Sequence, residues 1–338
     1  MKTTVRCLTA VATLMFGLAV PAMAQANPKS LCIYDPGGKS GDFNQILQDY
    51  KLQTKTWNVD VELKIYTDEE TAVKDYEANK CDGVLATGVR MQRFNRFPST
   101  VEAIGAVTEY DTLKSLVGAF VRYPSAAARL RSGVHETIGI LPAGKVYLYV
   151  RDRKIDTVGE LAGKRIATMT YDKASPVMVG RVGAIVVAAD LGSLGPKFNN
   201  GSVDACYMSA LAYEPFELWR GMSPDGGVIE LPLAMATLQL MVHHESFPAD
   251  FGAKSRAWFA GQFDRAQRAV QREEDKIDKK YWIKIPPADL PGFEDMFLKV
   301  RLDLRDKHKA YDGTMLSTLR KLRCAKDASR SECVEKKE

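Results

Sequence analysis

The spacing of hydrophobic residues alternates several times between strand-like and helix-like over residues 29–88, and this pattern predicts strands separated by helices. Apolar residues recur at helical spacing after Asp42, which is expected to cap that helix. The predicted elements are a strand at 31–34, a turn-rich loop at 35–42, a helix at 42–50, a strand at 59–66, a helix at 67–79 and a strand with its exit loop at 81–88. Strands that alternate with helices predict a parallel α/β sheet.

The rest of the chain continues this mixture. Residues 89–135 are expected to be mostly helical, with a strand-like stretch around Ile104. Further strands are predicted at 138–141, 146–150, 164–167, 203–207 and 231–242, and helices at 248–279, 289–308 and 311–323. The polar tail beyond Cys333 is expected to be frayed.

The N-terminus has the layout of a cleavable secretory signal peptide at residues 1–24. Lys2 and Arg6 precede an apolar run at 11–20, and small residues follow, so cleavage is expected near Ala24. The run is shorter than the ~20 residues that cross a bilayer. An uncleaved membrane anchor is the alternative, whereas a lipid anchor is not indicated because Cys7 precedes the apolar run.

Composition indicates an ordinary globular chain of one large or two medium domains. The 338 residues are 46% hydrophobic and 26% charged, with a formal net charge of +5. Loss of Lys2 and Arg6 with the signal peptide lowers this charge by two, to +3. That balance does not indicate a nucleic-acid partner, and no later segment reads as a membrane span.

Five cysteines remain after the predicted cleavage, and an exported chain can oxidise them. Cys32 and Cys81 open strands that we expect to be neighbours, so a disulfide between them is predicted. A second is expected between Cys324 and Cys333 in the tail, which leaves Cys206 as an inert buried thiol. The cysteine spacings do not match zinc motifs and the histidines are scattered, so neither a metal site nor a cofactor is predicted.

Two segments carry a family resemblance. Residues 155–167 resemble the stretch that opens the second lobe of periplasmic solute-binding proteins, and residues 198–205 resemble their later Gly-x-Val-Asp segment. The closest likeness is to the solute receptors of TRAP transporters. Within that group, residues 35–42, 66–69 and 81–85 resemble the AdeT-like family of putative solute receptors. The resemblance covers nearly all of the mature chain.

The resemblance implies the type 2 periplasmic-binding-protein fold, an α/β architecture of two lobes with mixed sheets, flanking helices and crossing hinge strands. Lobe one would comprise 27–147 plus 235–338, and lobe two 148–234. It implies a monomeric periplasmic receptor that captures a small-molecule solute in the interlobe cleft and delivers it to TRAP-type membrane transporter subunits. Some family members carry an efflux-pump label, which fits poorly because no spanning helices or coiled-coil hairpins are predicted.

Two loops of the expected first lobe are candidates for ligand contact. In the loop at 35–42, glycines let the backbone approach a ligand, and Asp35, Lys39 and Asp42 add charge. The alternative is an ordinary strand-to-helix turn, and Walker A spacing is absent. After the third strand, Arg90 offers a forked donor for an anionic or carbonyl group, unless it is part of a solvated helix face.

Two loops of the expected second lobe complete the candidate site. Thr170 and Tyr171 lie where a strand feeds a helix N-terminus, where hydroxyl and backbone N–H groups bind polar atoms. Tyr207 and Met208 follow another strand, and Tyr147 comes from a crossing strand. Aromatic walls with polar tips suit small organic ligands. Each tyrosine can instead be a core residue.

One departure from the family pattern concerns the ligand. Most TRAP receptors place a carboxylate-binding arginine two residues after the lysine of a Gly-x-Lys-Ile pattern; here Arg165 matches that lysine, and the residue two positions later is Ala167. Arg165 itself is expected to point to the opposite face of the strand. The ligand can therefore be a neutral or cationic molecule, or an acid held by Arg90.

Two other classes of function stay open at this stage. An enzyme on the same fold would need a catalytic pair in the cleft, and His135, His243 and Cys206 have no evident partner there. A non-transport envelope partner or regulator with a vestigial cleft, including an efflux-associated one, is the main alternative. No catalytic residue is therefore predicted.

Overall fold

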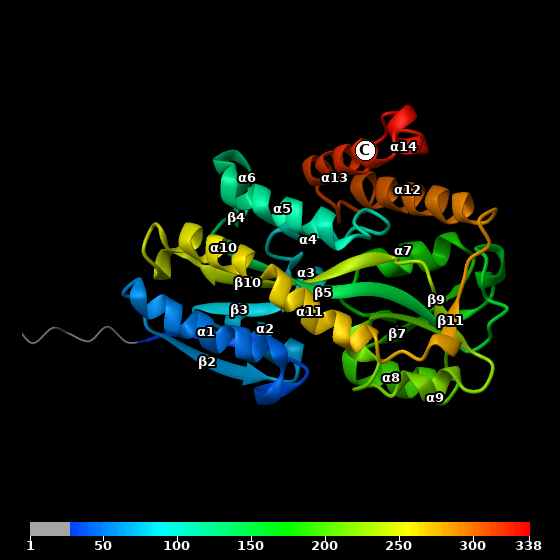
Figure 1. Cartoon of the computed structure of the whole chain (residues 1–338), viewed down its shortest axis with the longest axis horizontal. Coiled ribbons are helices and arrows are strands. Elements are labelled where there is room, and N and C mark those ends of the chain that lie inside the picture. Colours follow the sequence, from blue (N-terminus) through cyan, green and yellow to red (C-terminus); the bar gives the residue numbers. More distant parts are fainter. Residues whose placement is uncertain (1–27) are drawn as a thin grey trace, which may run out of the picture.

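One mixed sheet runs through the molecule and joins two groups of parallel strands. The computed structural model describes residues 28–338, so the predicted signal peptide at 1–24 lies outside the described residues. The main path of the sheet has the strand order β2-β1-β3-β10-β5-β8-β6-β7, and β4, β9 and β11 pair beside it. Figure 1 shows the first group in blue and cyan and the second group in green, at opposite ends of the long axis.

The first group contains the parallel strands that the alternating pattern predicted. They are β1 (Lys29–Tyr34), β2 (Val61–Tyr66) and β3 (Gly83–Thr87), connected by α1 (Asp42–Thr56) and α2 (Glu69–Glu77). The apolar face of α1 is buried through Phe43, Ile46, Leu47 and Tyr50, the residues at helical spacing. Asp42 is not the cap of α1 as predicted, because Gly41 occupies the N-cap and Asp42 lies in the first turn.

Two long strands cross from one group to the other. β10 (Ala234–His243) runs antiparallel to both β3 and β5 (His135–Val150). The prediction of separate strands at 138–141 and 146–150 was wrong, since β5 continues through the Pro142–Gly144 stretch. The chain accommodates this stretch with a register shift in the pairing and with a positive φ of 101° at Gly144.

The second group forms the other end of the sheet. Its strands β6, β7 and β8 pair in parallel, and the last of them also pairs antiparallel with β5. The elements of this end are β6 (Arg165–Met169), α7 (Ala174–Arg181), β7 (Ile185–Ala189), α8 (Leu191–Asn199), β8 (Ala205–Ser209), α9 (Leu218–Met222), β9 (Gly227–Ile229) and β11 (Trp282–Ile283).

Short helices occupy the segment between β3 and β5. They are α3 (Gly88–Met91), α4 (Arg96–Ser99), α5 (Tyr110–Arg122) and α6 (Pro124–Ala128), followed by β4 (Arg131–Ser132). A 3₁₀ turn covers Thr100–Glu102, and the strand expected around Ile104 is a turn instead. Ile104 is buried in this turn and donates its backbone N–H to the Tyr311 hydroxyl at 3.3 Å.

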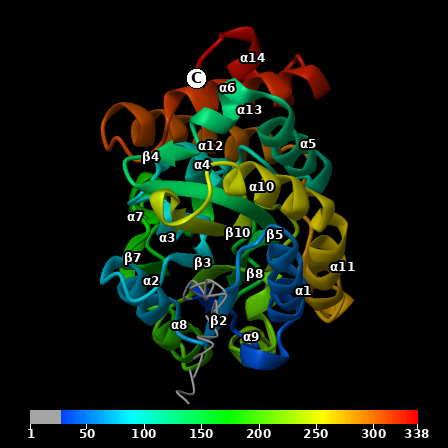
Figure 2. The ribbon, with the colours of Figure 1, turned by 90° about the vertical axis from the view of Figure 1, so that its left-hand side faces the viewer.

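The C-terminal helices cover the sheet and add an outer layer. α10 (Phe251–Gly261) and α11 (Phe263–Glu274) break at Gln262, so the single helix predicted over 248–279 was wrong. α12 (Leu290–Asp306), α13 (Gly313–Lys326) and α14 (Ser331–Val334) follow. Figures 1 and 2 show α12, α13 and α14 together with α5 on the same side of the sheet. Within residues 28–338, no helix combines the length and the hydropathy needed to cross a bilayer.

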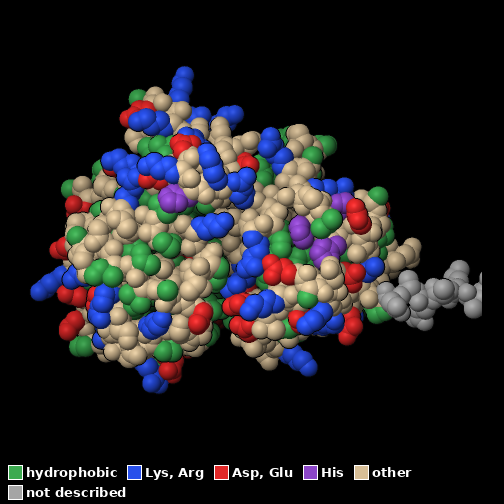
Figure 3. All heavy atoms as spheres, turned by 180° about the vertical axis from the view of Figure 1, so that it is seen from behind, with side chains coloured by type: hydrophobic (Ala, Val, Ile, Leu, Met, Phe, Trp, Pro, Cys, Tyr) green, Lys and Arg blue, Asp and Glu red, His purple; other side chains and the backbone are tan. Residues whose placement is uncertain are grey.

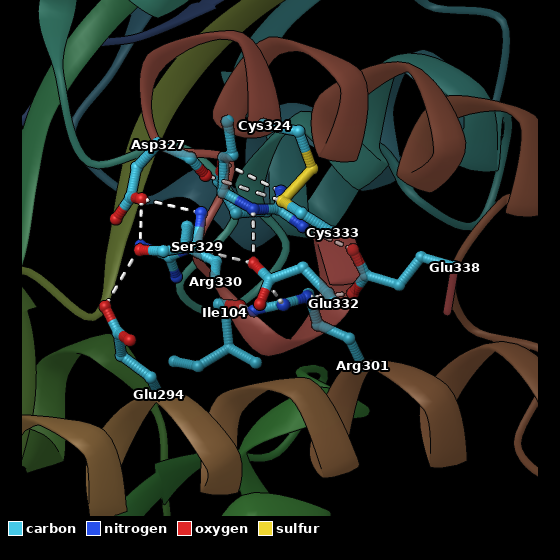
Figure 4. Close-up of polar contacts among 12 residues, drawn as sticks. Ile104, Glu294, Arg301, Cys324, Asp327, Ser329, Arg330, Glu332, Cys333 and Glu338 are labelled. Carbon is cyan, nitrogen blue, oxygen red and sulfur yellow. Dashed lines mark hydrogen bonds and ion pairs between the residues drawn. A yellow bond between two sulfur atoms is a disulfide. The ribbon is translucent and has the colours of Figure 1, made fainter. Parts of the chain in front are cut away.

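The C-terminal tail is anchored by buried charges rather than frayed. Arg301 is fully buried and pairs with Glu338 and, at 3.6 Å, with Glu332, and Arg323 pairs with the same two carboxylates. These four residues are named the C-terminal ion cluster (Figure 4). Arg301 Nη1 also donates to the backbone oxygen of Ile104 at 2.9 Å, so the cluster holds the turn after the 3₁₀ segment. The prediction of a frayed end was therefore wrong.

Both predicted disulfides are present. Cys32 and Cys81 are bonded, and their Cα atoms lie 5.8 Å apart because β1 and β3 are adjacent in the sheet. Cys324 and Cys333 are bonded beside the C-terminal ion cluster, and Cys206 is a buried free thiol. Both bonds therefore link parts of the chain that the fold brings together.

Removal of the Cys32–Cys81 bond is expected to destabilise the protein. The bond closes a loop of 49 residues. Loss of the restraint on the unfolded chain costs about 4 kcal/mol. Urea unfolding of the double variant Cys32→Ala/Cys81→Ala measures this difference, with the reduced wild-type protein as a second comparison. A change below about 1 kcal/mol, or recovery of both cysteines as free thiols in non-reducing peptide mapping, would contradict the expectation.

Candidate functional site

A cavity of about 190 Å³ lies between the two groups of strands. Its walls come from both ends of the sheet and from the crossing strand β10, whose residues Ala234, Ala236 and Leu238 alternate toward it. Seen from behind, the surface is notched at its lower edge between two rounded halves (Figure 3). Most lining side chains are apolar, including Val89, Val146, Met169, Met178, Leu211, Phe216 and Leu233. A concave, mostly apolar site with a few polar groups is the usual form of a small-molecule site.

The charged groups in the cavity wall are all acidic. Glu69, Glu102 and Asp172 line the cavity, whereas no lysine, arginine or histidine of residues 28–338 does. The three carboxylates come from three separate segments. Their hydrogen bonds differ, and these differences decide which carboxylate can act on a ligand.

Glu69 is neutralised by a fixed network that joins the two ends of the sheet. One carboxylate oxygen accepts the backbone N–H of Thr87 at 2.7 Å and its hydroxyl at 2.6 Å. The other accepts Arg90 Nε at 3.0 Å and the Tyr171 hydroxyl at 3.3 Å. The guanidinium carbon of Arg90 lies 3.6 Å from the centre of the Tyr171 ring. Tyr171 therefore closes over the Glu69–Arg90 pair from the second group of strands.

Glu102 is held by backbone groups and is nine-tenths buried. Its Oε1 accepts the N–H groups of Gly88 at 3.1 Å and Thr237 at 2.6 Å, and the Thr237 hydroxyl at 2.5 Å. A Cβ on Gly88 would lie 2.3 Å from this oxygen, so only glycine permits the approach. Burial raises the pKa of Glu102 to about 8 despite these hydrogen bonds.

Asp172 is held at the start of α7. Its carboxylate accepts the backbone N–H of Ala174 at 2.8 Å, the Ser175 hydroxyl, and the Tyr207 hydroxyl at 3.2 Å. The same Tyr207 oxygen accepts the backbone N–H of Met169 at 3.3 Å. These bonds fix the aromatic ring of Tyr207 as part of the cavity wall.

The structure brings four of the predicted ligand residues together. Tyr171, Tyr207 and Met208 line the cavity, and Arg90 lies directly behind Tyr171. Arg90 is 5% exposed and paired with Glu69, so it does not belong to a solvated helix face. Of the aromatic wall residues, Tyr171 and Tyr207 were predicted, and contact of these four residues with a ligand stays a prediction.

Pro36 of the loop at 35–42 lines the cavity, but the three predicted ligand residues of this loop do not. Asp35 is buried and accepts the backbone N–H of Asn44 at 2.8 Å, at the start of α1. Burial raises the pKa of Asp35. Lys39 is exposed, and Asp42 pairs with Arg272 of α11 at 3.0 Å. Ligand contact by Asp35, Lys39 or Asp42 stays a prediction that would require this loop to move.

Tyr147 and Thr170 are the other two predicted residues outside the wall. Tyr147 is buried in β5 and donates its hydroxyl to Glu274 of α11 at 3.0 Å, which is the core arrangement considered as its alternative. Thr170 is exposed at the end of β6. Neither side chain lines the cavity as it stands, and their contact with a ligand likewise stays a prediction.

The three acidic wall residues were not among the predicted ligand residues. Glu69 follows a strand in the acidic first turn of α2, a pattern that also fits a helix start stabilised by negative charge. Glu102 lies in a segment without a clear period. Glu69 and Asp172 each follow the end of a strand and lie at or just before the start of a helix. This placement was the available signal, because the carboxyl ends of strands face ligands in α/β sheets.

The position of the missing arginine is occupied by Ala167, which is fully buried. Arg165 and Ala167 are two residues apart in β6 and share a face of the strand, so the expectation of opposite faces was wrong. Arg165 is exposed at the start of β6 and pairs with Asp204 at 2.7 Å. His135 and His243 contact Tyr76, outside the cavity wall. Cys206 is fully buried, and burial raises the pKa of its thiol.

The fold is that of two-lobed solute-binding proteins, and solved structures of that class superpose on this chain. A TRAP periplasmic solute-binding protein from Desulfovibrio salexigens with bound orotic acid matches with TM-score 0.70 at 14% identity, over 88% of this chain and 99% of that chain. One from Haemophilus influenzae with bound L-gulonate matches with TM-score 0.71 at 10% identity, over 87% and 99%. At this identity the likeness shows the shared fold.

The chain belongs to the solute-binding protein AdeT 1/2 family, whose model matches residues 54–338. It is 36% identical over 303 residues to the probable solute-binding protein AdeT1 of Acinetobacter baumannii, which covers 89% of this chain and 98% of that protein. It is 25% identical to the probable solute-binding protein AdeT2 of the same organism, over 69% of this chain. The family resemblance noted in the sequence is thus confirmed.

Substitution of Tyr171 is expected to weaken ligand binding in two steps. Tyr171→Phe keeps the ring on Arg90 and removes one hydrogen bond to Glu69, so affinity should fall by less than about tenfold. Tyr171→Ala removes the wall and should lower affinity by about 100-fold. Calorimetric titration of any solute found by screening measures both. Equal affinities for the alanine variant and the wild-type protein would contradict this role of Tyr171.

Proposed function

We propose that this chain is a periplasmic receptor that captures a small molecule in the cavity between its lobes and delivers it to a TRAP-type membrane transporter. The observation that carries the proposal is the mostly apolar cavity, whose walls come from both ends of the sheet. Membership of a solute-binding family supports capture of a solute. The lobe boundaries at 27–147 plus 235–338 and at 148–234 are part of this proposal, as are the cleaved signal peptide and a monomeric state.

The contact between Tyr171 and the Glu69–Arg90 pair supports closure around a ligand. It joins Tyr171, in the loop after β6, to Glu69 of α2 and Arg90 of α3, which belong to the first group of strands and its helices. Because β5 and β10 are the strands that cross between the ends, small changes along them can open the cavity. A receptor of this kind exchanges its solute through opening and closing.

Capture is tested by a thermal-shift screen of the mature protein with sugars, amino acids, organic acids, amines, polyamines and aminoglycosides. A specific solute at about 100-fold over its dissociation constant stabilises by about 2.7 kcal/mol. Ala236→Trp fills the cavity from β10 and should abolish the shift. Met235→Leu changes the opposite face of the same strand and should retain it.

Delivery requires a separate measurement. Uptake of the identified solute by cells that lack this chain should fall to background, and the wild-type protein, but not Ala236→Trp, should restore it. If the solute binds but uptake does not depend on the chain, the role of a non-transport envelope partner or regulator is favoured. If no solute in the screen changes the melting temperature, capture itself is contradicted.

A further inference from the structure

Glu102 presents one carboxylate oxygen to which no side chain donates. The hydrogen bonds of Glu102 from Gly88 and Thr237 all go to Oε1, the backbone N–H of Val89 also acts on the carboxyl group, and no side chain of residues 28–338 donates to Oε2. Glu102 lines the cavity and is 8% exposed. A mostly buried carboxylate with an oxygen free of side-chain donors gains from a donor or a cation that a ligand brings.

The other charges around the cavity do not offer a site for an anion. Arg90 contacts the wall residues Glu69 and Tyr171, but Glu69 pairs with it and the Tyr171 ring covers it at 3.6 Å. Asp172 adds a second acidic group, held by Ser175 and Tyr207. A carboxylate ligand would therefore meet two acidic side chains and no unpaired cation of residues 28–338 in the cavity wall.

We propose that the solute is a small organic cation, a protonated amine on an apolar body, whose nitrogen pairs with Glu102 Oε2. This inference rests on the proposed function and narrows it to a class of solute. The apolar body would pack against Val89, Met178 and Leu233, which line the same cavity. The faces of Tyr171 and Tyr207 stabilise a cation in addition, through their ring electrons.

The protonation of Glu102 couples binding to pH. Its pKa of about 8 leaves it mostly protonated near neutral pH, and a bound cation favours the ionised form. The groups that face this part of the cavity are Glu69, Asp172 and Tyr311, and burial raises the pKa of Tyr311. Affinity for a permanent cation should rise by up to about tenfold per pH unit between pH 6 and 8 and level off above pH 8.5.

The test compares amines, acids and alcohols that share one skeleton. Calorimetric titration or thermal shift is run with phenethylamine, 3-phenylpropionate and 2-phenylethanol, and with the corresponding cyclohexyl and linear alkyl compounds. Phenethyltrimethylammonium is titrated from pH 6 to 9 because its charge does not change. The amine of a series should bind at least tenfold more tightly than the acid. Glu102→Gln should remove that preference and the pH dependence, whereas the exposed control Glu109→Gln should keep both.

The outcomes separate this inference from the receptor function. Tighter binding of the acid, or an amine preference that survives in Glu102→Gln, overturns the inference and leaves a receptor for another solute. If no compound of any charge class binds better to the wild-type protein than to Ala236→Trp, the inference and the proposed function both fall. Circular dichroism of each variant confirms that it is folded before its affinity is interpreted.

Discussion

Replacement of Arg301 by alanine is expected to lower the free energy of unfolding by about 3–5 kcal/mol, because it removes one partner from a buried ion pair. Arg301 is fully buried on α12 and pairs with Glu338 and Glu332. Without it, Glu338 keeps only Arg323, and the backbone oxygen of Ile104 loses its donor. Urea unfolding followed by circular dichroism measures the loss.

The matched control for this change is Arg305→Ala, one helical turn further along α12. Arg305 pairs with the neighbouring Asp306 at 2.7 Å and is partly exposed, so the cost should stay below about 1 kcal/mol. Because Ile104 lines the cavity, Arg301→Ala should also weaken solute binding, and Arg305→Ala should not. Equal losses of stability in the two variants would contradict the anchoring role of the C-terminal ion cluster.

Replacement of Glu102 by glutamine is expected to stabilise the solute-free protein at alkaline pH. Folding raises the pKa of Glu102 from its ordinary value of 4.5 to about 8, mainly through burial. The folded state therefore holds more protons than the unfolded state between these values. The favourable contribution of the protonated group is complete below pH 4.5 and is lost as the pH rises through 8. Above pH 8 the variant should be more stable than the wild-type protein by a margin on the order of 4 kcal/mol.

Unfolding of Glu102→Gln and of the wild-type protein is compared at pH values from 4.5 to 9. The difference between the two free energies should grow with pH across this window. Glu109→Gln, at an exposed carboxylate, should follow the wild-type protein within about 0.5 kcal/mol throughout. A Glu102→Gln curve that runs parallel to the wild-type curve would contradict the raised pKa.

Local periodicity was enough to predict the strands and helices of the first group and strands β6 and β8 of the second, but not β7, α8 or the features that depend on distant contacts. β5 passes through Pro142 and Gly144, residues typical of turns, because β10 pairs alongside and the register shift absorbs the distortion. The break at Gln262 falls within a segment that is amphipathic on both sides. The C-terminal tail is held by ion pairs of Glu338 with Arg301 and Arg323, which lie more than ten residues earlier in the chain. The polar sequence of the tail alone therefore led to the wrong prediction of a frayed end.

In the candidate site, too, local pattern predicted some residues, whereas others depend on contacts between distant segments. Tyr171, Tyr207 and Met208 follow strand ends, and the rule that ligands meet those ends placed them in the cavity wall. Glu102 faces the cavity because Gly88 and Thr237, separate segments of the chain, both donate to it. No local pattern marks such a residue. Tyr147 was predicted to contact a ligand because it is a tyrosine on a crossing strand, but its hydroxyl donates to Glu274 instead. Residue type alone therefore did not decide which tyrosines line the cavity.

Binding of a solute in the cavity between the two lobes is tested directly by a crystal structure of the complex with the solute that stabilises the protein most. We expect electron density for the solute between Tyr207 and β10, with a polar or charged atom within hydrogen-bond distance of Glu102 Oε2. Density confined to the outer groove between α1 and α11, beside Asp42 and Arg272, with an empty interlobe cavity would contradict it.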